Sequence, residues 1–467
     1  MRSFQRPVGK KYIFEHVGVA KSFSDVFFFI FFKEENIMNR TFEVNKAGHL
    51  VLGGVDTVEL AHEYGTPLYV MEEDKILSAM REYKNSIDRF YNGNGLIYYA
   101  SKAFSCKEIY RIAMREGLGA DVVSGGELYT ALSVGFPAEK ICFHGNNKTR
   151  DELTFAVKEN VGRIVVDNIE ELENLSVIAN EFKKDVSVLL RIKPGVDAHT
   201  HSFIMTGQID SKFGFALENG EAIDAVKKVV ASENITFKGL HCHIGSQIHE
   251  LLPFVETAKI MMNFIKKIKN ETGVETDELN LGGGYGINYT DEDARIEYPA
   301  YMEAVSKTLK ECAESLKVKL PFIMMEPGRS IVGEAGTTLY TIGSVKEIKD
   351  VRTYVSVDGG MQDNPRYILY GAKYDFLIAN KACESRNMVV TVAGKCCESG
   401  DLLGENVKIA KCAAGDICAV FSTGAYNYSM ASNYNRNIIP PVIFVKDGKA
   451  RVVVKRQTYE YVCENDI

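Results

Sequence analysis

Long apolar stretches, tryptophan and an excess of positive charge are all missing from this sequence. It contains no tryptophan, and its longest strongly apolar run, Val26–Phe32, has seven residues, whereas a helix needs about 20 to cross a bilayer. The 55 lysines and arginines are outnumbered by 62 aspartates and glutamates. We therefore expect neither a membrane-spanning protein nor a nucleic-acid or anionic-lipid partner.

Cysteine pairs at metal-binding spacing are missing as well. The ten cysteines include no C-x-x-C pair, and Cys396 and Cys397 are direct neighbours. In a chain of this length, such a pattern indicates neither a disulfide framework nor a structural zinc site. We interpret the cysteines as reduced thiols of a cytoplasmic protein, and we expect no metal site.

The first 37 residues do not match the rest of the chain. Basic residues precede Val26–Phe32, as they do in a signal peptide, but Lys33-Glu34-Glu35 follows where a small-residue cleavage site should be. Ordinary globular patterning begins at Met38. We interpret residues 1–37 as a mis-assigned start or a disordered extension.

A regular alternation of strand-like and helix-like segments begins near Glu73. The strand-like runs are short, apolar and rich in β-branched residues: Leu96–Ala100, Ala120–Val123, Lys140–Phe143, Arg163–Val166, Val186–Ile192, Phe237–His243, Glu278–Leu281 and Phe322–Met325. Helical segments separate them: Lys107–Glu116, Gly126–Val134, Arg150–Glu159, Ile169–Phe182, Glu221–Ala231, Pro253–Ile268 and Pro299–Leu316. This rhythm over roughly 250 residues predicts an α/β protein with a (β/α)8 TIM-type barrel, and a doubly wound open sheet is the alternative.

The rhythm changes after Arg329. Strand-like segments with Gly, Asn and Asp turns follow: Thr338–Ile348, Tyr354–Asp358, Met388–Ala393, Asp416–Phe421, Val442–Val445 and Arg451–Val454. We predict a barrel domain over residues 73–332 and a mostly β C-terminal domain over residues 333–467. Strand-like pieces in residues 38–72 are expected to complete that β domain.

Polar residues gather at one end of the predicted barrel strands. The C-terminal ends carry Lys102, Ser124, His144, Asp167, Asn168, Arg191, His241, His243, Ser246, Gly282–Gly284 and Glu326–Arg329. The N-terminal ends carry no comparable cluster. Because (β/α)8 barrels build their active sites at the C-terminal strand ends, the asymmetry favours an enzyme over a structural barrel.

Lys102 follows the apolar strand Leu96–Ala100. An ammonium at the mouth of such a strand is costly unless it is paired or its pKa is depressed. A depressed pKa activates a lysine for Schiff-base chemistry. The alternative is a lysine whose stem covers apolar surface while its charge stays in water.

Histidine and glycine motifs follow the sixth and seventh predicted strands. The backbone N–H groups of Gly282–Gly284 can approach a phosphate closely, and a plain loop is the alternative. His241 and His243 point the same way along a strand. A ring stacked on histidine, with Ser246 bonding a phosphate, explains the motif better than zinc, because no third zinc ligand is evident. For His241, a core histidine remains the alternative.

Glu326 and Arg329 close the eighth predicted strand. A buried glutamate needs a cationic partner, which is either the ring nitrogen of a pyridoxal cofactor or Arg329 itself. Arg329 also suits a phosphate or a carboxylate, which its guanidinium can bind with two parallel hydrogen bonds.

Two further motifs lie in the predicted β domain. Arg366, close to Tyr370, fits a carboxylate clamp, and the pair Cys397–Glu398 fits a reactive thiol beside an acid. Tyr426 lies in the aromatic segment GAYNYSM. Each motif taken alone is also compatible with an ordinary loop or with packing.

Together these motifs resemble the fold-type III pyridoxal-phosphate decarboxylases. That family includes ornithine, arginine and diaminopimelate decarboxylases, and alanine racemase is a more distant relative. The resemblance rests on YYASKA, ADVVSGGEL, FHGNNK, HCHIGSQ, GGGYGI, EPGR, CESGD and GAYNYSMASNYN. It runs from about Met38 to the C-terminus, and the motifs are most similar to those of the diaminopimelate branch.

The resemblance implies roles for the candidate catalytic residues. Lys102 would bind pyridoxal phosphate covalently, His243 would stack on its ring, and Glu326 would keep its ring nitrogen protonated. Cys397 would be the proton donor and would reach in from the other subunit of a homodimer. Glu398 would bind the distal ammonium of the substrate.

The resemblance also implies cofactor and substrate contacts. The cofactor phosphate and its surroundings would be held by Ser246, Gly283, Gly284, Pro327, Gly328, Arg329 and Tyr426. The substrate carboxylates would be bound by Arg329, Arg366 and Tyr370, with Tyr426 beside them.

The implied reaction is decarboxylation of meso-2,6-diaminopimelate to L-lysine and CO2, the last step of lysine biosynthesis. One alternative is a decarboxylase for ornithine, arginine or carboxynorspermidine; Arg366 with Glu398 favours a substrate whose far end is zwitterionic. Another is a non-catalytic pyridoxal-phosphate carrier, which would need no proton donor such as Cys397.

Overall fold

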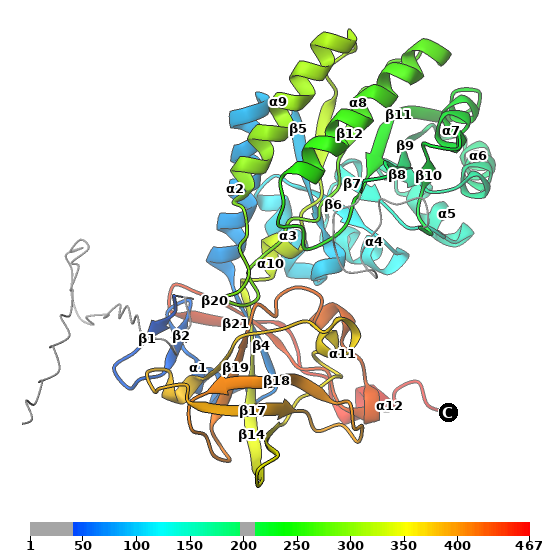
Figure 1. Ribbon diagram of the computed structural model, residues 1–467. Coiled ribbons are helices and arrows are strands. Elements are labelled where there is room, and N and C mark those ends of the chain that lie inside the picture. The colour runs from blue at the N-terminus through cyan, green and yellow to red at the C-terminus, as the bar shows by residue number, and fades with distance from the viewer. Residues whose placement is uncertain (1–40, 197–210) are drawn as a thin grey trace, which may run out of the picture.

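The computed structural model describes residues 41–196 and 211–467. The segment 1–37, interpreted above as an extension, lies outside the described residues. Figure 1 shows two parts: helices surround a parallel sheet in one, and the other consists mostly of strands.

Parallel strands close into a barrel in the first part. Within the described residues there are eight of them: β5 (Gly95–Ala100), β6 (Gly119–Val122), β7 (Ile141–Phe143), β8 (Arg163–Val166), β9 (Val186–Lys193), β11 (Ile235–Cys242), β12 (Glu278–Asn280) and β13 (Phe322–Met325). The pairings of β8 with β9 and of β13 with β5 close the ring, and the short β10 (Phe215–Ala216) pairs with β9. The predicted (β/α)8 barrel is confirmed, and the open doubly wound sheet is wrong.

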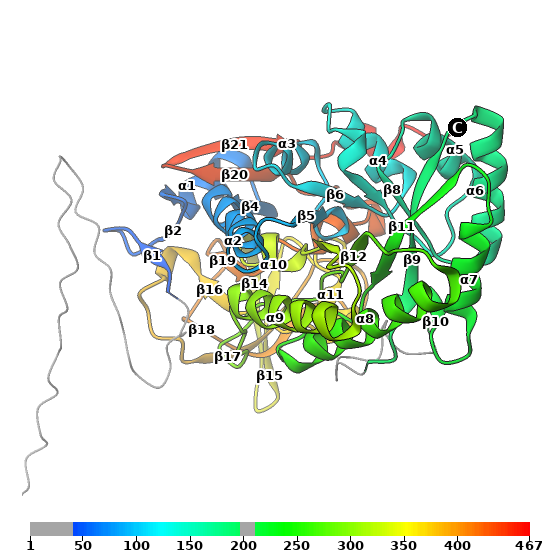
Figure 2. The ribbon, with the colours of Figure 1, turned by 90° about the horizontal axis from the view of Figure 1, so that it is seen from above.

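Helices cover the outside of the barrel. They are α2 (Glu73–Tyr91), α3 (Lys107–Arg115), α4 (Gly125–Leu132), α5 (Arg150–Lys158), α6 (Ile169–Phe182), α7 (Glu221–Val230), α8 (Leu252–Thr272) and α9 (Tyr298–Leu316). Figure 2 shows α5, α6 and α7 along one side and α8 and α9 along another. In the ranges 41–196 and 211–467, no helix combines the length and apolar character that crossing a bilayer demands.

Helix α2 was not predicted from the sequence. Its buried face includes Ile76, Met80, Tyr83 and Ile87, which recur at the three- to four-residue spacing of an amphipathic helix. The signal was therefore present in the sequence. The helix fills the position before the first barrel strand.

Some polar strand ends serve the helices and not a site. Ser124 accepts a hydrogen bond from the backbone N–H of Glu127 at the start of α4, and Asn168 accepts one from Glu171 at the start of α6. Such caps satisfy backbone donors that a helix leaves free at its N-terminus. These two residues do not line the cavity described below.

The N-terminal end of the barrel contains an ion pair and a layer of apolar side chains. Arg163 of β8 pairs with Glu278 of β12. The layer consists of Tyr98, Cys142, Val165, Leu189 and Met324. This pair was not predicted from the sequence, because its members lie 115 positions apart in the chain.

The second part is a β domain. One sheet runs in the order β18 (Leu402–Ile409), β17 (Met388–Ala393), β15 (Arg352–Val357), β14 (Gly336–Ile348), β4 (Leu68–Glu72), β20 (Val442–Lys446) and β21 (Lys449–Val454), and β19 (Ile417–Phe421) and β16 (Phe376–Ile378) join it beside β14. A small sheet of β1 (Glu43–Val44), β2 (Leu50–Leu52) and β3 (Val55–Asp56) precedes α1 (Thr57–Tyr64). Strand β4 lies between β14 and β20, so the chain before the barrel contributes to this sheet.

One apolar core continues from the barrel into the β domain. Phe104, just after β5, lies 6.2 Å from Phe444 of β20 and 5.5 Å from Tyr428, measured between ring centres. These residues belong to or pack against the same buried cluster. The shared core fixes the β domain against the barrel, with its loops at the C-terminal strand ends.

Candidate active site

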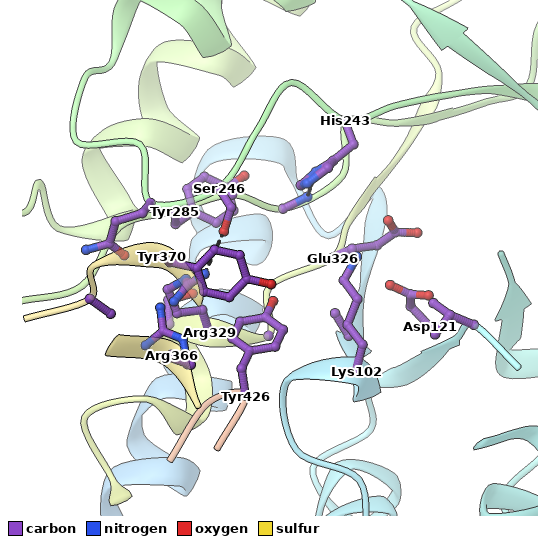
Figure 3. A pocket seen from close by; sticks show the side chains of 18 of the residues that line it. Lys102, Asp121, His243, Ser246, Tyr285, Glu326, Arg329, Arg366, Tyr370 and Tyr426 are labelled. Atoms are coloured by element: carbon purple, nitrogen blue, oxygen red, sulfur yellow. Dashed lines mark hydrogen bonds between the residues drawn. The ribbon is translucent and has the colours of Figure 1, made fainter. Parts of the chain in front are cut away.

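A cavity of about 780 Å³ opens at the C-terminal ends of the barrel strands. Barrel residues line one side of it, and residues of the β domain line the other (Figure 3). The predicted site residues that it brings together are Lys102, His243, Ser246, Gly283, Gly284, Glu326, Gly328, Arg329, Arg366, Tyr370 and Tyr426. A cavity of this size accommodates a cofactor together with a small substrate.

Lys102 lies in a short 3-10 turn, Ser101–Ala103, directly after β5. Its side chain faces the cavity, close to Asp121 of the neighbouring strand β6 and to Glu326 (Figure 3). Lys102 is exposed to the cavity; the surrounding protein lowers its pKa, but the attraction of Asp121 and Tyr426 outweighs that effect, so its pKa lies above the usual value. Of the two possibilities that the sequence left open for this ammonium, the free protein therefore favours stabilisation by a nearby carboxylate over a depressed pKa.

Glu326 follows β13 and is held by three donors. Its Oε1 accepts hydrogen bonds from His144 Nε2 at 2.7 Å and from Asn280 Nδ2 at 2.5 Å, and its Oε2 accepts one from His241 Nε2 at 3.0 Å. Burial alone would raise the pKa of Glu326, but His144 and His241, through the hydrogen bonds that they donate, hold it well below the usual range. Glu326 is therefore a carboxylate at neutral pH.

Arg329 does not form the alternative ion pair with Glu326. Its Nη2 donates to Ser246 Oγ at 3.0 Å, and its Nη1 donates to the hydroxyl of Tyr289. Its guanidinium also lies 4.7 Å from the ring centre of Tyr426. The Nε atom is buried and has no hydrogen-bond partner among the described residues, so a donor remains for a ligand.

The glycine loop after β12 packs directly against other backbone. A Cβ atom on Gly283 would lie 2.2 Å from the carbonyl oxygen of Glu326, and one on Gly284 would lie 2.4 Å from that of Gly245. Gly283 N–H donates to Nδ1 of His243 at 3.3 Å. Only glycine fits here, and the loop leaves backbone, not side chains, facing the cavity.

His243 lies beside this loop. Burial lowers its pKa well below the usual value, and the nearby Lys102 and Arg191 charges act in the same direction. The ring is therefore neutral at physiological pH. An uncharged imidazole is suited to stack flat against an aromatic ring.

Arg366 begins the short helix α11 (Arg366–Tyr370) of the β domain. Its Nη1 donates to the hydroxyl of Tyr374 at 2.7 Å, and its guanidinium lies 4.9 Å from the ring centre of Tyr289. Figure 3 shows Arg366 and Arg329 on the same side of the cavity, with Tyr370 close by. Two arginines from different domains thus give one end of the cavity the charge that a carboxylate requires.

Three predicted site residues do not line the cavity of this chain. Cys397 and Glu398 are exposed on a loop of the β domain. Pro327 is buried, and its carbonyl oxygen accepts a hydrogen bond from the Ala100 N–H at 3.1 Å, which joins the ends of β13 and β5.

The structure adds cavity residues that the sequence-based list of site residues did not contain. They include Asp121 and Tyr289, together with His144, Arg191 and His241, which the sequence placed at strand ends but which were not among the predicted site residues. Asp121 had a signal, because a charged residue between Ala120 and Val122 in an apolar strand must point into the barrel. For Tyr289 the sequence contained no such signal, because this residue lies in the irregular segment after the glycine loop.

The arrangement fits pyridoxal phosphate on three observations. The amine of Lys102 faces the cavity, a carboxylate is available at Glu326 for a ring nitrogen, and the loop at Gly283 is closed to any side chain. The unpartnered Nε of Arg329 adds a donor for an anionic group.

Comparison with known proteins agrees with this geometry. A family model described as "Pyridoxal-dependent decarboxylase, pyridoxal binding domain" matches residues 73–333. Over 92% of this chain and 98% of the relative, the sequence is 48% identical to a diaminopimelate decarboxylase of Bacillus subtilis. It is 50% identical to that of Bacillus methanolicus, over 89% of this chain and 96% of the relative.

Solved structures show the same relationship. A diaminopimelate decarboxylase of M. jannaschii in complex with L-lysine superposes with a TM-score of 0.86 and 36% identity, covering 92% of this chain and 98% of that one. One from Helicobacter pylori, also with L-lysine, has a TM-score of 0.80 and 31% identity, covering 88% and 98%. The resemblance seen in the motifs is confirmed, and the chain belongs to the diaminopimelate decarboxylases of the pyridoxal-dependent decarboxylase family.

Proposed function

We propose that this protein uses pyridoxal phosphate to decarboxylate meso-2,6-diaminopimelate to L-lysine and CO2. The observation that carries the proposal is the division of one cavity into two ends. Lys102 and Glu326 form one end, and Arg329 and Arg366 form the other. The first end suits the cofactor, and the second suits a carboxylate that the reaction leaves in place.

The cofactor would be held by side chains from several strand ends. Lys102 would bind it covalently, His243 would stack on its ring, and Glu326 would accept a hydrogen bond from its ring nitrogen. Ser246, Gly283, Gly284 and Tyr426 would hold its phosphate. When bound, pyridoxal phosphate takes up the electron pair that the departing CO2 leaves behind.

The chain's own residues set the charges around that step. The charge of Asp121 favours the protonated form of Lys102 before the cofactor is bound. Glu326 places a negative charge where a positively charged ring nitrogen would otherwise be destabilised by burial. Residues of the β domain line the cavity at the mouth of the barrel.

Substrate choice would rest on the two arginines. Diaminopimelate carries a carboxylate and an ammonium at the end that does not react, whereas ornithine carries only an ammonium there. Arg329 and Arg366 would bind the carboxylate, and with ornithine they would face each other without a counter-charge.

We further infer a homodimer whose partner subunit completes each site. Cys397 and Glu398 are exposed and lie outside the cavity of their own chain, so they are available to another. The Cys397 thiol would give its proton to the carbon that has lost CO2, so that a C–H bond replaces the broken C–C bond. Glu398 would bind the distal ammonium. The exposed apolar side chains of Ile368 and Leu369 beside the cavity support a contact surface there.

The domain division and the location of the protein are part of the same proposal. The pairing of β4 with β14 and β20 supports one domain made of residues 38–72 and 333–467, with the barrel over residues 73–332.

All ten cysteines are free thiols, which supports a reducing compartment such as the cytoplasm.

One experiment tests the function. Purified protein mixed with pyridoxal phosphate should gain a visible absorbance band, and it should release CO2 from meso-diaminopimelate in preference to ornithine and arginine. Lys102→Ala should abolish both, and the matched control Lys107→Ala, at an exposed position on α3, should retain both. No band in the unmodified protein, or a preference for ornithine, would contradict the proposal.

A further inference from the structure

Among the described residues, three side chains outside the predicted catalytic set surround the carboxylate of Glu326. His144 directly follows β7, His241 lies in β11, and Asn280 ends β12. Their donor nitrogens lie 2.7, 3.0 and 2.5 Å from the Glu326 oxygens. Four strand ends of the barrel thus meet at a single carboxylate.

All four side chains are buried. Glu326 is 7% exposed, His144 4%, His241 1% and Asn280 0%. These side chains have little contact with solvent, and a buried group that loses its hydrogen-bond partner pays a cost of desolvation. The direction in which the carboxylate points is therefore set by these side chains and not by solvent.

The proton positions on His241 follow from its surroundings. Its Nε2 must carry a hydrogen in order to donate to the carboxylate of Glu326. Its Nδ1 is buried and has no hydrogen-bond partner among the described residues, so a second proton there would have no acceptor. Burial accordingly lowers the pKa of His241 to about 3. His241 is a neutral donor and leaves the negative charge of Glu326 in place.

The second histidine completes the arrangement. The rings of His144 and His241 lie 4.7 Å apart at an angle of 66°, and they reach different oxygens of Glu326. Other titratable groups face this carboxylate from the neighbouring elements: Lys102, Asp121, Cys142, Arg191, His243 and Tyr98. In the described part of the chain, the hydrogen bonds to the Glu326 oxygens come from His144, His241 and Asn280.

We propose that His144 and His241 are positioning residues that keep Glu326 ionised and aimed at the ring nitrogen of pyridoxal phosphate. They act by donating Nε2–H to opposite oxygens, with Asn280 as a third donor. This inference rests on the proposed function and goes beyond it, because that function requires Glu326 but assigns no role to the two histidines.

The proposal can be tested by measuring cofactor affinity, without measuring catalysis. Two probes are compared: pyridoxal phosphate, and its 1-deaza analogue, in which a C–H group replaces the ring nitrogen. The unmodified protein should bind pyridoxal phosphate more tightly by about 10- to 100-fold, the range expected for one hydrogen bond to a charged group. In His241→Leu and His144→Leu, the ratio of the affinities for the two probes should fall toward one. His241→Gln keeps a hydrogen-bond donor and should retain most of the preference for pyridoxal phosphate.

Controls separate positioning from packing. Val165→Ala, in the apolar layer at the other end of the barrel, should lower stability but leave the preference unchanged. The visible spectrum of each loaded variant should also be recorded across the pH range, because a ring nitrogen that loses a fixed carboxylate loses its proton at lower pH. Leucine variants that fold and keep the full preference and the same pH profile would overturn the proposal.

A measurement on the unmodified protein keeps the proposal testable if the leucine variants do not fold. With ¹⁵N-labelled histidine, the NMR signals of His241 in the loaded protein should show a neutral ring protonated at Nε2. A ring protonated only at Nδ1 could not donate to Glu326 and would overturn the inference. Failure of the unmodified protein to bind pyridoxal phosphate at all would instead remove the proposed function.

Discussion

The guanidinium of Arg366 lies 4.9 Å from the ring centre of Tyr289. The hydroxyl of the same tyrosine accepts a hydrogen bond from Arg329. Tyr289 thus lies between two positive charges from different domains. It offers its electron-rich face to one and its oxygen to the other, which offsets part of the repulsion between them.

Removing only the hydroxyl should loosen Arg329. Tyr289→Phe keeps the ring under Arg366 but loses a hydrogen bond to a charged group, a contact that contributes about 1.5–3 kcal/mol. We expect KM for diaminopimelate to rise by about tenfold or more, with a smaller change in kcat. Steady-state kinetics checks this. The control is Tyr354→Phe, since Tyr354 lies 5.7 Å from Arg352 in a pair outside the cavity; equal effects of the two variants would contradict the role of Tyr289.

The glycine loop should not tolerate even a methyl group. In Gly283→Ala, the new Cβ would lie 2.2 Å from the carbonyl oxygen of Glu326, so the loop or the end of β13 must move. We expect a loss of pyridoxal-phosphate affinity of at least about tenfold, measured by absorbance titration. Gly126→Ala is the control, because a Cβ there meets only Ser124 Oγ at 3.7 Å and alanine favours its helix. Unchanged affinity in Gly283→Ala would show that the loop does not contact the cofactor.

The charge of Asp121 should set the pH at which Lys102 becomes reactive. Asp121 raises the pKa of Lys102 in the free protein, so Asp121→Asn removes an attraction that favours the protonated amine. The pKa of Lys102 should fall, and a larger fraction of the amine should be neutral at a given pH. We expect the pH profile for the rate of pyridoxal-phosphate capture by cofactor-free protein to shift to lower pH. A shift to higher pH, or an equal shift in Asp74→Asn on the exposed face of α2, would contradict this.

Asp401 should matter for stability, because it joins two loops. Its carboxylate accepts hydrogen bonds from the backbone N–H groups of Met361 and Cys396, both at 2.6 Å. Asp401→Ala leaves both donors without partners, and each costs about 1–3 kcal/mol when buried. We expect the free energy of unfolding to fall by about 2–5 kcal/mol in denaturant titrations. The exposed Glu303→Ala, on α9, should change it by less than about 0.5 kcal/mol.

A smaller loss in Asp401→Ala would mean that water reaches these N–H groups. The same variant should lower kcat as well, because one of the two loops carries Cys397 and the other leads to Arg366. Stopped-flow or steady-state kinetics at a temperature well below unfolding separates this effect from loss of folded protein.

Local patterns predicted much of the barrel. Helix α6 begins and ends where its apolar stripe does, at Ile169 and Phe182. A one-sided apolar stripe indicates an amphipathic helix whichever elements the helix packs against. The β domain was less predictable. Strands β16 and β18 were not expected. The strand-like pieces of residues 38–72 were expected to join this domain, but the pairing of β4 with β14 and β20 was not predicted. Strand pairing depends on partners that a local pattern does not contain.

The sequence by itself determined which residue types stand at the strand ends and, through its motifs, the family. Tertiary structure alone decided how those ends combine. Closure of the barrel brings His144 within 2.7 Å of Glu326 across 182 positions of the chain, and the docked β domain adds Arg366 to the same cavity. It also leaves Cys397 on the surface. The physical reason is that periodicity reports the backbone geometry of one segment, whereas the site depends on contacts between segments, which burial and hydrogen bonding select only once the whole chain is packed.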